Sequence, residues 1–209
     1  IAHSIDREGI VKALVQGESI VVNSLCFPSQ FGCTQDVPTY DYNPEKAKKL
    51  LAEAGYPNGF ETPFLAYRNR DYAEAMINNL NAVGIKAKLE YLKYAAFRDK
   101  VQSGGAPFNF GTWGSYSIND VSAITSHFQS GGKDDYSKDP EVIKQLGIGD
   151  TSVDANVRLA AYKAALSRIS GEAFMFPLWS YNTWYAFSKD VDFNPTPDEI
   201  PRFFTAKWM

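Results

Sequence analysis

The sequence has too few histidines for most metal sites and catalytic triads. Among its 209 residues only His3 and His127 carry an imidazole ring, which disfavours a histidine-based triad and a multi-histidine metal site. No G-x-S-x-G nucleophile elbow occurs, and "SGGK" lacks the earlier glycine of a phosphate-binding loop. The sequence therefore predicts neither a metal ion nor a cofactor.

Basic charge and long apolar runs are also scarce. The net charge is −3 at pH 7 and no basic run occurs, so a nucleic-acid partner is disfavoured. No apolar stretch approaches the roughly 20 residues that a membrane-spanning helix needs. Aromatic residues, by contrast, make up 14% of the chain, which is typical of a β-rich core or of a ligand surface on which rings stack.

Cysteine occurs only at Cys26 and Cys33, in the segment "CFPSQFGC". Pro28 and Gly32 allow this segment to turn back on itself. Two interpretations are open: a local disulfide, which implies an oxidising compartment, and two unrelated small core residues of a cytosolic protein. A zinc site is disfavoured because no second cysteine or histidine pair lies nearby.

The middle of the chain alternates helical and extended patterns. Helices are expected over residues 44–54, 71–83 and 94–105, and strands over 60–67, 85–91 and 107–113. This order predicts an α/β architecture whose central sheet is mixed, with some parallel strands, and is flanked by helices. A further long helix is expected over residues 153–170. It follows a polar loop in which Asp134 and Asp135 are expected to be exposed to solvent. The aromatic segment 172–187 predicts paired or bent strands.

Apolar spacing predicts which side chains are buried. On the expected helices they are Ala73, Met76, Ile77, Leu80 and Val83, then Tyr94, Phe97 and Val101, then Leu159, Tyr162, Leu166 and Ile169. On the expected strand 85–91 they are Ile85, Ala87, Leu89 and Tyr91. The C-terminal tail also ends in apolar side chains, which need a surface to pack against.

One loop combines an indole with polar side chains. In "FGTWGSYSIND" a strand ends at Trp113, and small and polar side chains follow it. The candidate ligand-binding residues here are Trp113, Gly114, Ser115, Tyr116, Asn119 and Asp120. Ligands of α/β proteins collect at the carboxyl ends of strands, and an aromatic wall with a few polar tips suits a small-molecule cleft. The alternative is a core tryptophan followed by a helix-capping Asn or Asp.

Two arginines follow the first strand of the expected sheet. Arg68 and Arg70, in "AYRNRDY", have the chemistry to clamp a carboxylate bidentately. Exposed arginines without a ligand are common, and the residues alone favour that interpretation.

Several segments, taken in order, resemble the family 5 extracellular solute-binding proteins of ABC transporters. They are "SIDREGIVKALVQG", "YNPEKAKKLLAEAGYPNGF", "INNLNAVGIKAKLE", "TWGSYSINDVSAI", "ANVRLAAYKAAL" and "FPLWSYNTWYAFSKDV". The resemblance implies a periplasmic binding protein-like fold. Residues 1–188 would form its C-terminal lobe, and the tail 189–209 would return to an N-terminal lobe that this chain lacks.

The resemblance also implies a function. A peptide-like or other small polar solute would be captured between two lobes and delivered to the membrane subunits of an ABC permease. The protein would be periplasmic, or extracellular and membrane-anchored, and export favours the Cys26–Cys33 disulfide.

The resemblance leaves the solute open. Peptide-binding members of the family place a carboxylate three residues after the loop tryptophan, where this chain has Tyr116. Either the solute has no free α-amino group there, or Asp120 takes the carboxylate's place; we favour the first. Two other classes are weighed: a hydrolase that uses Asp120 with Ser115 or Ser117, and a purely structural interaction module. The hydrolase lacks a positioned base, and the interaction module would leave the cleft at Trp113 without a purpose.

Overall fold

The computed structural model describes residues 1–15, 17–196 and 200–209. Its helices and strands, in chain order, are η1 (Ala2–Ser4), α1 (Arg7–Leu14), α2 (Pro44–Glu53), β1 (Phe60–Ala66), α3 (Arg70–Ala82), β2 (Ile85–Tyr91), α4 (Tyr94–Gln102), β3 (Asn109–Phe110), η2 (Ser115–Ser117), α5 (Ser122–Phe128), α6 (Pro140–Thr151), α7 (Ala155–Gly171), β4 (Val191–Asp192), η3 (Phe203–Thr205) and β5 (Lys207–Trp208). Within these ranges no helix is both long and apolar enough to cross a bilayer.

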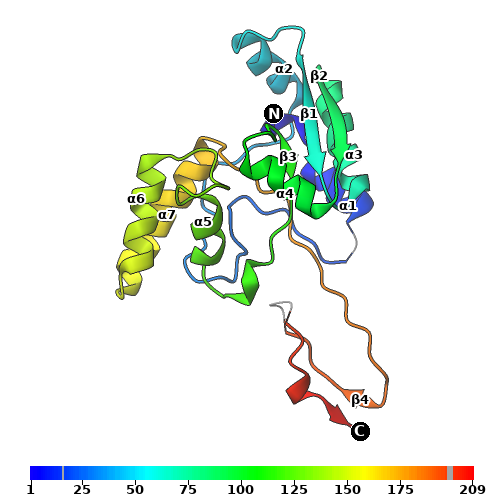
Figure 1. Ribbon diagram of the computed structural model, residues 1–209, viewed down its shortest axis with the longest axis vertical. Helices are drawn as coiled ribbons and strands as arrows, with labels where there is room; N and C mark the ends of the chain where they lie inside the picture. The colour runs from blue at the N-terminus through cyan, green and yellow to red at the C-terminus, as the bar shows by residue number, and fades with distance from the viewer. Residues whose placement is uncertain (16, 197–199) are drawn as a thin grey trace.

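The central sheet has the strand order β2-β1-β3. Phe60 pairs with Ile85, and Leu65 with Asn109, and both pairings are parallel. The expected α/β class is confirmed, but the strands of this described sheet are all parallel where a mixed sheet was expected. The strands are parallel because α3 and α4 each return the chain to the end of the sheet at which the previous strand began (Figure 1). β3 is shorter than the expected strand 107–113.

The apolar face of α3 forms the core against this sheet. All five residues expected on this face are buried, together with Ile85 and Ala87 of β2 and Phe97 and Val101 of α4. Two expectations were wrong: Tyr91 and Tyr94 are exposed, because they lie at the end of β2 and the start of α4, where the chain leaves the sheet.

A buried arginine joins distant segments beside α1. Asp6 caps this helix by accepting the Gly9 N–H at 2.8 Å, and Arg7 follows at its first position. The Arg7 guanidinium donates to the carbonyls of Val22, Pro177 and Tyr40 and to the side chain of Asn23, at 2.9–3.2 Å. It also lies over the Phe176 ring. Burial lowers the pKa of Arg7 against the opposing effect of Glu8.

The antiparallel helices α6 and α7 form a second core (Figure 1). Tyr162, Leu166 and Ile169 of α7 are fully buried as expected, but Leu159, in the second turn of the helix, is 43% exposed. Helix α6 was not expected. It begins after Asp139, which caps the helix and forms a bidentate ion pair with Arg168 of α7. The hydrogen bonds from Arg168 and from the α6 backbone lower the pKa of Asp139 to about 2.

The expectation of a solvent-exposed loop around Asp134 and Asp135 was wrong. Asp135 is buried, accepts the Gly131 and Lys138 N–H groups and accepts the Ser137 hydroxyl. Asp134 pairs with Arg98 of α4, and its side chain is 7% exposed. Both carboxylates are tolerated inside the protein because donors surround them.

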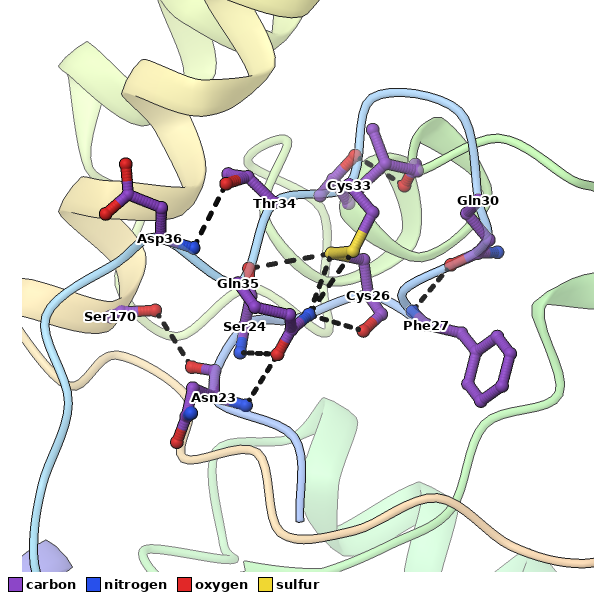
Figure 2. The surroundings of a disulfide bond; sticks show 12 residues. Asn23, Ser24, Cys26, Phe27, Gln30, Cys33, Thr34, Gln35, Asp36 and Ser170 are labelled. Atoms are coloured by element: carbon purple, nitrogen blue, oxygen red, sulfur yellow. Dashed lines mark hydrogen bonds between the residues drawn. A yellow bond between two sulfur atoms is a disulfide. The ribbon is translucent and has the colours of Figure 1, made fainter. Parts of the chain in front are cut away.

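Cys26 and Cys33 form a disulfide, which confirms the first of the two interpretations of this pair. In Figure 2, Gln35 lies beside it: Gln35 Nε2 donates to Cys33 Sγ and its Oε1 accepts the Asn23 N–H.

The segment after α7 runs beside the segment 20–22 without forming the expected regular strands. Val22 N–H donates to Leu178 O and Ser180 N–H donates to Ile20 O, around an isolated antiparallel bridge between Val21 and Trp179.

The tail leaves the body of the molecule (Figure 1). β4 and β5 pair with each other, and the side chains of Phe203, Phe204, Trp208 and Met209 are 72–86% exposed. These apolar side chains therefore stay largely exposed in the described structure, although the Phe203 ring stacks on that of Phe193. The division at residues 188 and 189 stays a prediction.

A contact between two glycines fixes the start of β1 and β2. Gly59 precedes β1 and has φ +73°, and a Cβ atom there would lie 1.8 Å from the carbonyl oxygen of Gly84, which precedes β2. Gly55 has a similar φ of +88° but open space around it. A substitution of Gly55 therefore measures the free-energy cost of the left-handed backbone conformation alone, without a steric clash.

We expect Gly59→Ala to lower the free energy of unfolding by about 3 kcal/mol, since it adds a backbone clash to the left-handed strain. Gly55→Ala should cost about 1 kcal/mol from strain alone. Urea unfolding of both variants measures the difference. Equal effects would show that the Gly59–Gly84 contact does not constrain the sheet.

Candidate ligand-binding cleft

An open cleft of about 1650 Å³ lies where the parallel strands end. Tyr67 follows β1 and residues 111–115 follow β3, and they line it together with residues of α5 and of the segment 173–183. Its lining is rich in aromatic rings with interspersed polar groups. The cleft thus lies at the carboxyl ends of the strands, where α/β proteins bind ligands.

Trp113 is packed on one side and lines the cleft on the other. Its ring stacks on His127 of α5, with the centroids 4.4 Å apart and the planes at 26°, and meets the Phe128 ring edge-on at 5.0 Å. The two alternatives for this tryptophan are therefore combined in one residue: α5 holds the indole while part of it lines the cleft.

The loop that follows Trp113 has an unusual backbone. Ser115 and Ser117 have φ values of 54° and 60°, which non-glycine residues rarely adopt. Such strain is concentrated at functional sites. Gly114, Ser115 and Asn119 line the cleft. The side chain of Tyr116 lies outside the part of the chain that the structure describes.

The carboxylate of Asp120 is engaged by the protein itself. Arg158 Nη2 of α7 donates to its Oδ2 at 2.7 Å, and its Oδ1 accepts the Ser122 N–H at the start of α5. Asp120 is not among the residues that line the cleft. Burial raises the pKa of Asp120, but the hydrogen bonds from Ser122 and Arg158 and the charge of Arg158 lower it below its ordinary value.

Arg158 extends this network into the α6–α7 core. It also donates to Gly149 O and to the Tyr162 hydroxyl, which in turn donates to Asp150. Burial, with the hydrogen bond to Asp150, raises the pKa of Tyr162 to about 12. The Asp120 carboxylate thereby ties the candidate loop to both helices.

The structure separates the two candidate arginines. Arg68 Nη1 donates to Thr112 Oγ1 at 3.0 Å, which places its head group beside the cleft lining. Arg70, at the first position of α3, pairs with Glu74 at 2.7 Å and lies over the Tyr91 ring. Only Arg68 is therefore brought near Trp113 and its loop.

Sequence reasoning missed a charged cluster in the cleft wall. Arg98 of α4 holds Asp134 through contacts of 2.6 and 2.8 Å, and His127 Nε2 lies 3.5 Å from Asp134 Oδ2. Burial raises the pKa of Asp134, but bonds from Arg98 and Gln102 lower it overall. Since Arg98 and Asp134 are 36 residues apart, no local pattern indicates the pair.

The family is shown by the sequence. Residues 1–135 match "Bacterial extracellular solute-binding proteins, family 5 Middle", and the chain belongs to this family. The resemblance inferred from the motifs is confirmed. The family consists of solute-binding proteins and not of enzymes, so the hydrolase alternative finds no support in it.

Two curated relatives match about half of the chain. Heme-binding protein A of Haemophilus influenzae is 32% identical over 110 residues, which are 49% of this chain and 20% of that protein. The dipeptide-binding protein of Escherichia coli is 34% identical over 109 residues, 46% of this chain and 20% of that protein. The matched part of the chain thus spans about a fifth of these relatives.

Solved structures cover the chain more fully. The structure of HbpA2 from Haemophilus parasuis has a TM-score of 0.86 at 27% identity and covers all of this chain and 44% of its own. A Pseudoalteromonas dipeptide-binding protein in complex with Met-Leu has a TM-score of 0.82, 23% identity and the same coverage, and shows the fold alone. The chain therefore spans less than half of these solved proteins.

We expect Asp120→Asn to lower the free energy of unfolding by about 1 kcal/mol at pH 7, since it removes a partly screened ion pair and keeps the acceptor for Ser122. Folding lowers the pKa of Asp120, so the ion pair's contribution is complete above pH about 4 and is lost as the pH falls through the folded-state value. Urea unfolding between pH 7 and pH 3 measures the difference between wild type and variant.

Asp36→Asn is the matched control. Lys163, which lies on α7 like Arg158, pairs with Asp36 at 2.7 Å. Both side chains are more than half exposed, so we expect little change in the free energy of unfolding. Equal losses for the two variants at pH 7, or an Asp120→Asn loss that is undiminished at pH 3, would contradict the role given to the Asp120–Arg158 pair.

Proposed function

We propose that this chain is a lobe of the solute-binding component of an ABC importer. The protein captures a small polar or peptide-like solute between two lobes outside the cytoplasmic membrane and delivers it to the permease subunits. The cleft at the strand ends carries this proposal, because it is open, aromatic and built on a lobe of the solute-binding family.

Support for two lobes comes from the open cleft and the uncovered tail. Ligand pockets normally bury most of the ligand's surface, which one wall alone cannot do. A second lobe would close this cleft and would also cover the exposed rings of the tail. Closure would be a hinge motion shifted by the solute's contacts with both lobes.

The test uses the full-length protein. Small molecules released from it by denaturation are identified by mass spectrometry, then returned to the stripped protein in calorimetry and small-angle scattering. We expect binding accompanied by compaction, and much weaker binding to residues 1–209 alone. Conversion of the solute into a new product would support the hydrolase instead. Equal affinity of fragment and whole protein would contradict the two-lobe function.

We further propose that the solute has no free α-ammonium group at the Trp113 loop. Asp120 is paired with Arg158 and does not line the cleft. Among the described lining residues the only carboxylate is Asp134, and Arg98 already balances its charge. An ammonium group buried without a carboxylate partner would be costly. The aromatic lining instead suits a flat or weakly charged group, and Arg68 is placed to meet a carboxylate at the rim.

Simple peptides are accordingly expected to be poor ligands. A ligand at a hundred times its Kd stabilises a protein by about 2.7 kcal/mol, which is easily seen as a rise in Tm. Millimolar Met-Leu should leave the Tm of the full-length protein nearly unchanged, and N-acetyl-Met-Leu is the matched control. A large Tm rise with Met-Leu that is lost on N-acetylation, and lost in Asp120→Ala or Asp134→Asn, would show that a carboxylate here does bind an ammonium group.

A further inference from the structure

The disulfide closes a loop with a rigid interior. Within residues 26–33, the Gln30 N–H donates to Phe27 O at 2.9 Å, and Gln30 Oε1 accepts the Phe27 N–H at 2.9 Å. The Cys33 N–H donates to Gln30 O at 3.1 Å. Gln30 thus bonds across the loop in addition to the covalent closure by Cys26 and Cys33, and it fixes the backbone of Phe27.

The same loop is joined to the loop that carries Trp113. Gln30 Nε2 donates to Ile118 O at 3.1 Å, the Phe31 N–H donates to Asn119 O, and the Val121 N–H donates to Phe31 O at 2.9 Å. These bonds form a short parallel bridge between Phe31 and Asp120. The position of residues 118–121 therefore depends on the disulfide-closed loop.

The loop also contributes directly to the cleft. Cys26, Phe27, Ser29 and Gln30 line it. Figure 2 shows the Phe27 ring turned away from the disulfide, and this ring is 45% exposed. A large ring that is exposed to the cleft on a covalently closed loop loses little conformational entropy on contact with a ligand, which is what a binding anchor requires.

We infer that the loop 26–33 is a specificity element of the solute cleft. Phe27 contacts an apolar or planar part of the solute, and the disulfide and Gln30 position both Phe27 and residues 118–121. The inference rests on the proposed solute-binding function and adds to it a recognition residue and a structural role for the disulfide.

Phe27→p-benzoylphenylalanine in the full-length protein tests the contact without knowledge of the solute. The protein is incubated with yeast extract, freed of unbound material and irradiated, and its intact mass is measured. We expect an added mass equal to that of a small molecule released from the unirradiated protein. Tyr56→p-benzoylphenylalanine is the control, since Tyr56 is 50% exposed and does not line the cleft; it should gain no mass.

The other outcomes of the cross-linking test are distinct. A cross-link from residue 27 to another part of the polypeptide, or no added mass while a small molecule is released, would overturn the role of Phe27 and leave the proposed function standing. If the unirradiated protein, incubated in the same way, releases no small molecule at all, the proposed function fails and this inference fails with it.

Amide hydrogen exchange tests the positioning role. Reduction with dithiothreitol, or Cys26→Ser combined with Cys33→Ser, should speed exchange at Phe31 and Val121 by about tenfold or more, because their bonds depend on the closed loop. The amides of Leu65 and Leu92, which donate to Phe108 O and Ala66 O beside the central sheet, should exchange as before. Unchanged rates at Phe31 and Val121, or equal acceleration at all four amides, would overturn the positioning role.

Discussion

The rest of the lobe depends on the hydrogen bonds of the Arg7 guanidinium group, which join four segments of the chain. Its acceptors lie on segments that are 15, 16, 33 and 170 residues away along the chain. A buried cation is tolerated only where it is well paired, and here three carbonyls, one amide and an aromatic face surround it. These hydrogen bonds position residues 20–23, which lead into the disulfide-closed loop. They also position residues 176–180, which line the cleft. Two segments that line the cleft therefore share one anchor.

The sequence predicts the elements whose signals are local. Asn43 and Pro44 start α2, strict alternation marks β2, and the apolar spacing of α3 matches its buried face. Helix α6 was missed because Gly147 and Gly149 weaken its helical signal. The structure gives the reason for Gly149: a Cβ atom there would lie 2.5 Å from the Tyr162 ring. A packing demand from α7 thus overrides local propensity, and no local pattern reveals it.

The candidate site was predictable in part for the same reason. The strand-end position of Trp113 follows from the element order, and the cleft does lie there. The pairing of Asp120 with Arg158 and of Asp134 with Arg98 joins residues 38 and 36 positions apart. Such tertiary pairs decide which charges remain available to a solute, because each of these two carboxylates already has an arginine partner.

The close contact between Gly59 and Gly84 has a consequence for how this lobe can evolve. A side chain at residue 59 is blocked by the carbonyl oxygen of residue 84, so neither turn can change its course without a matching movement of the other. Both turns begin parallel strands that pair from their first residues, Phe60 with Ile85. Selection therefore acts on the two turns as one unit, although 25 residues separate them.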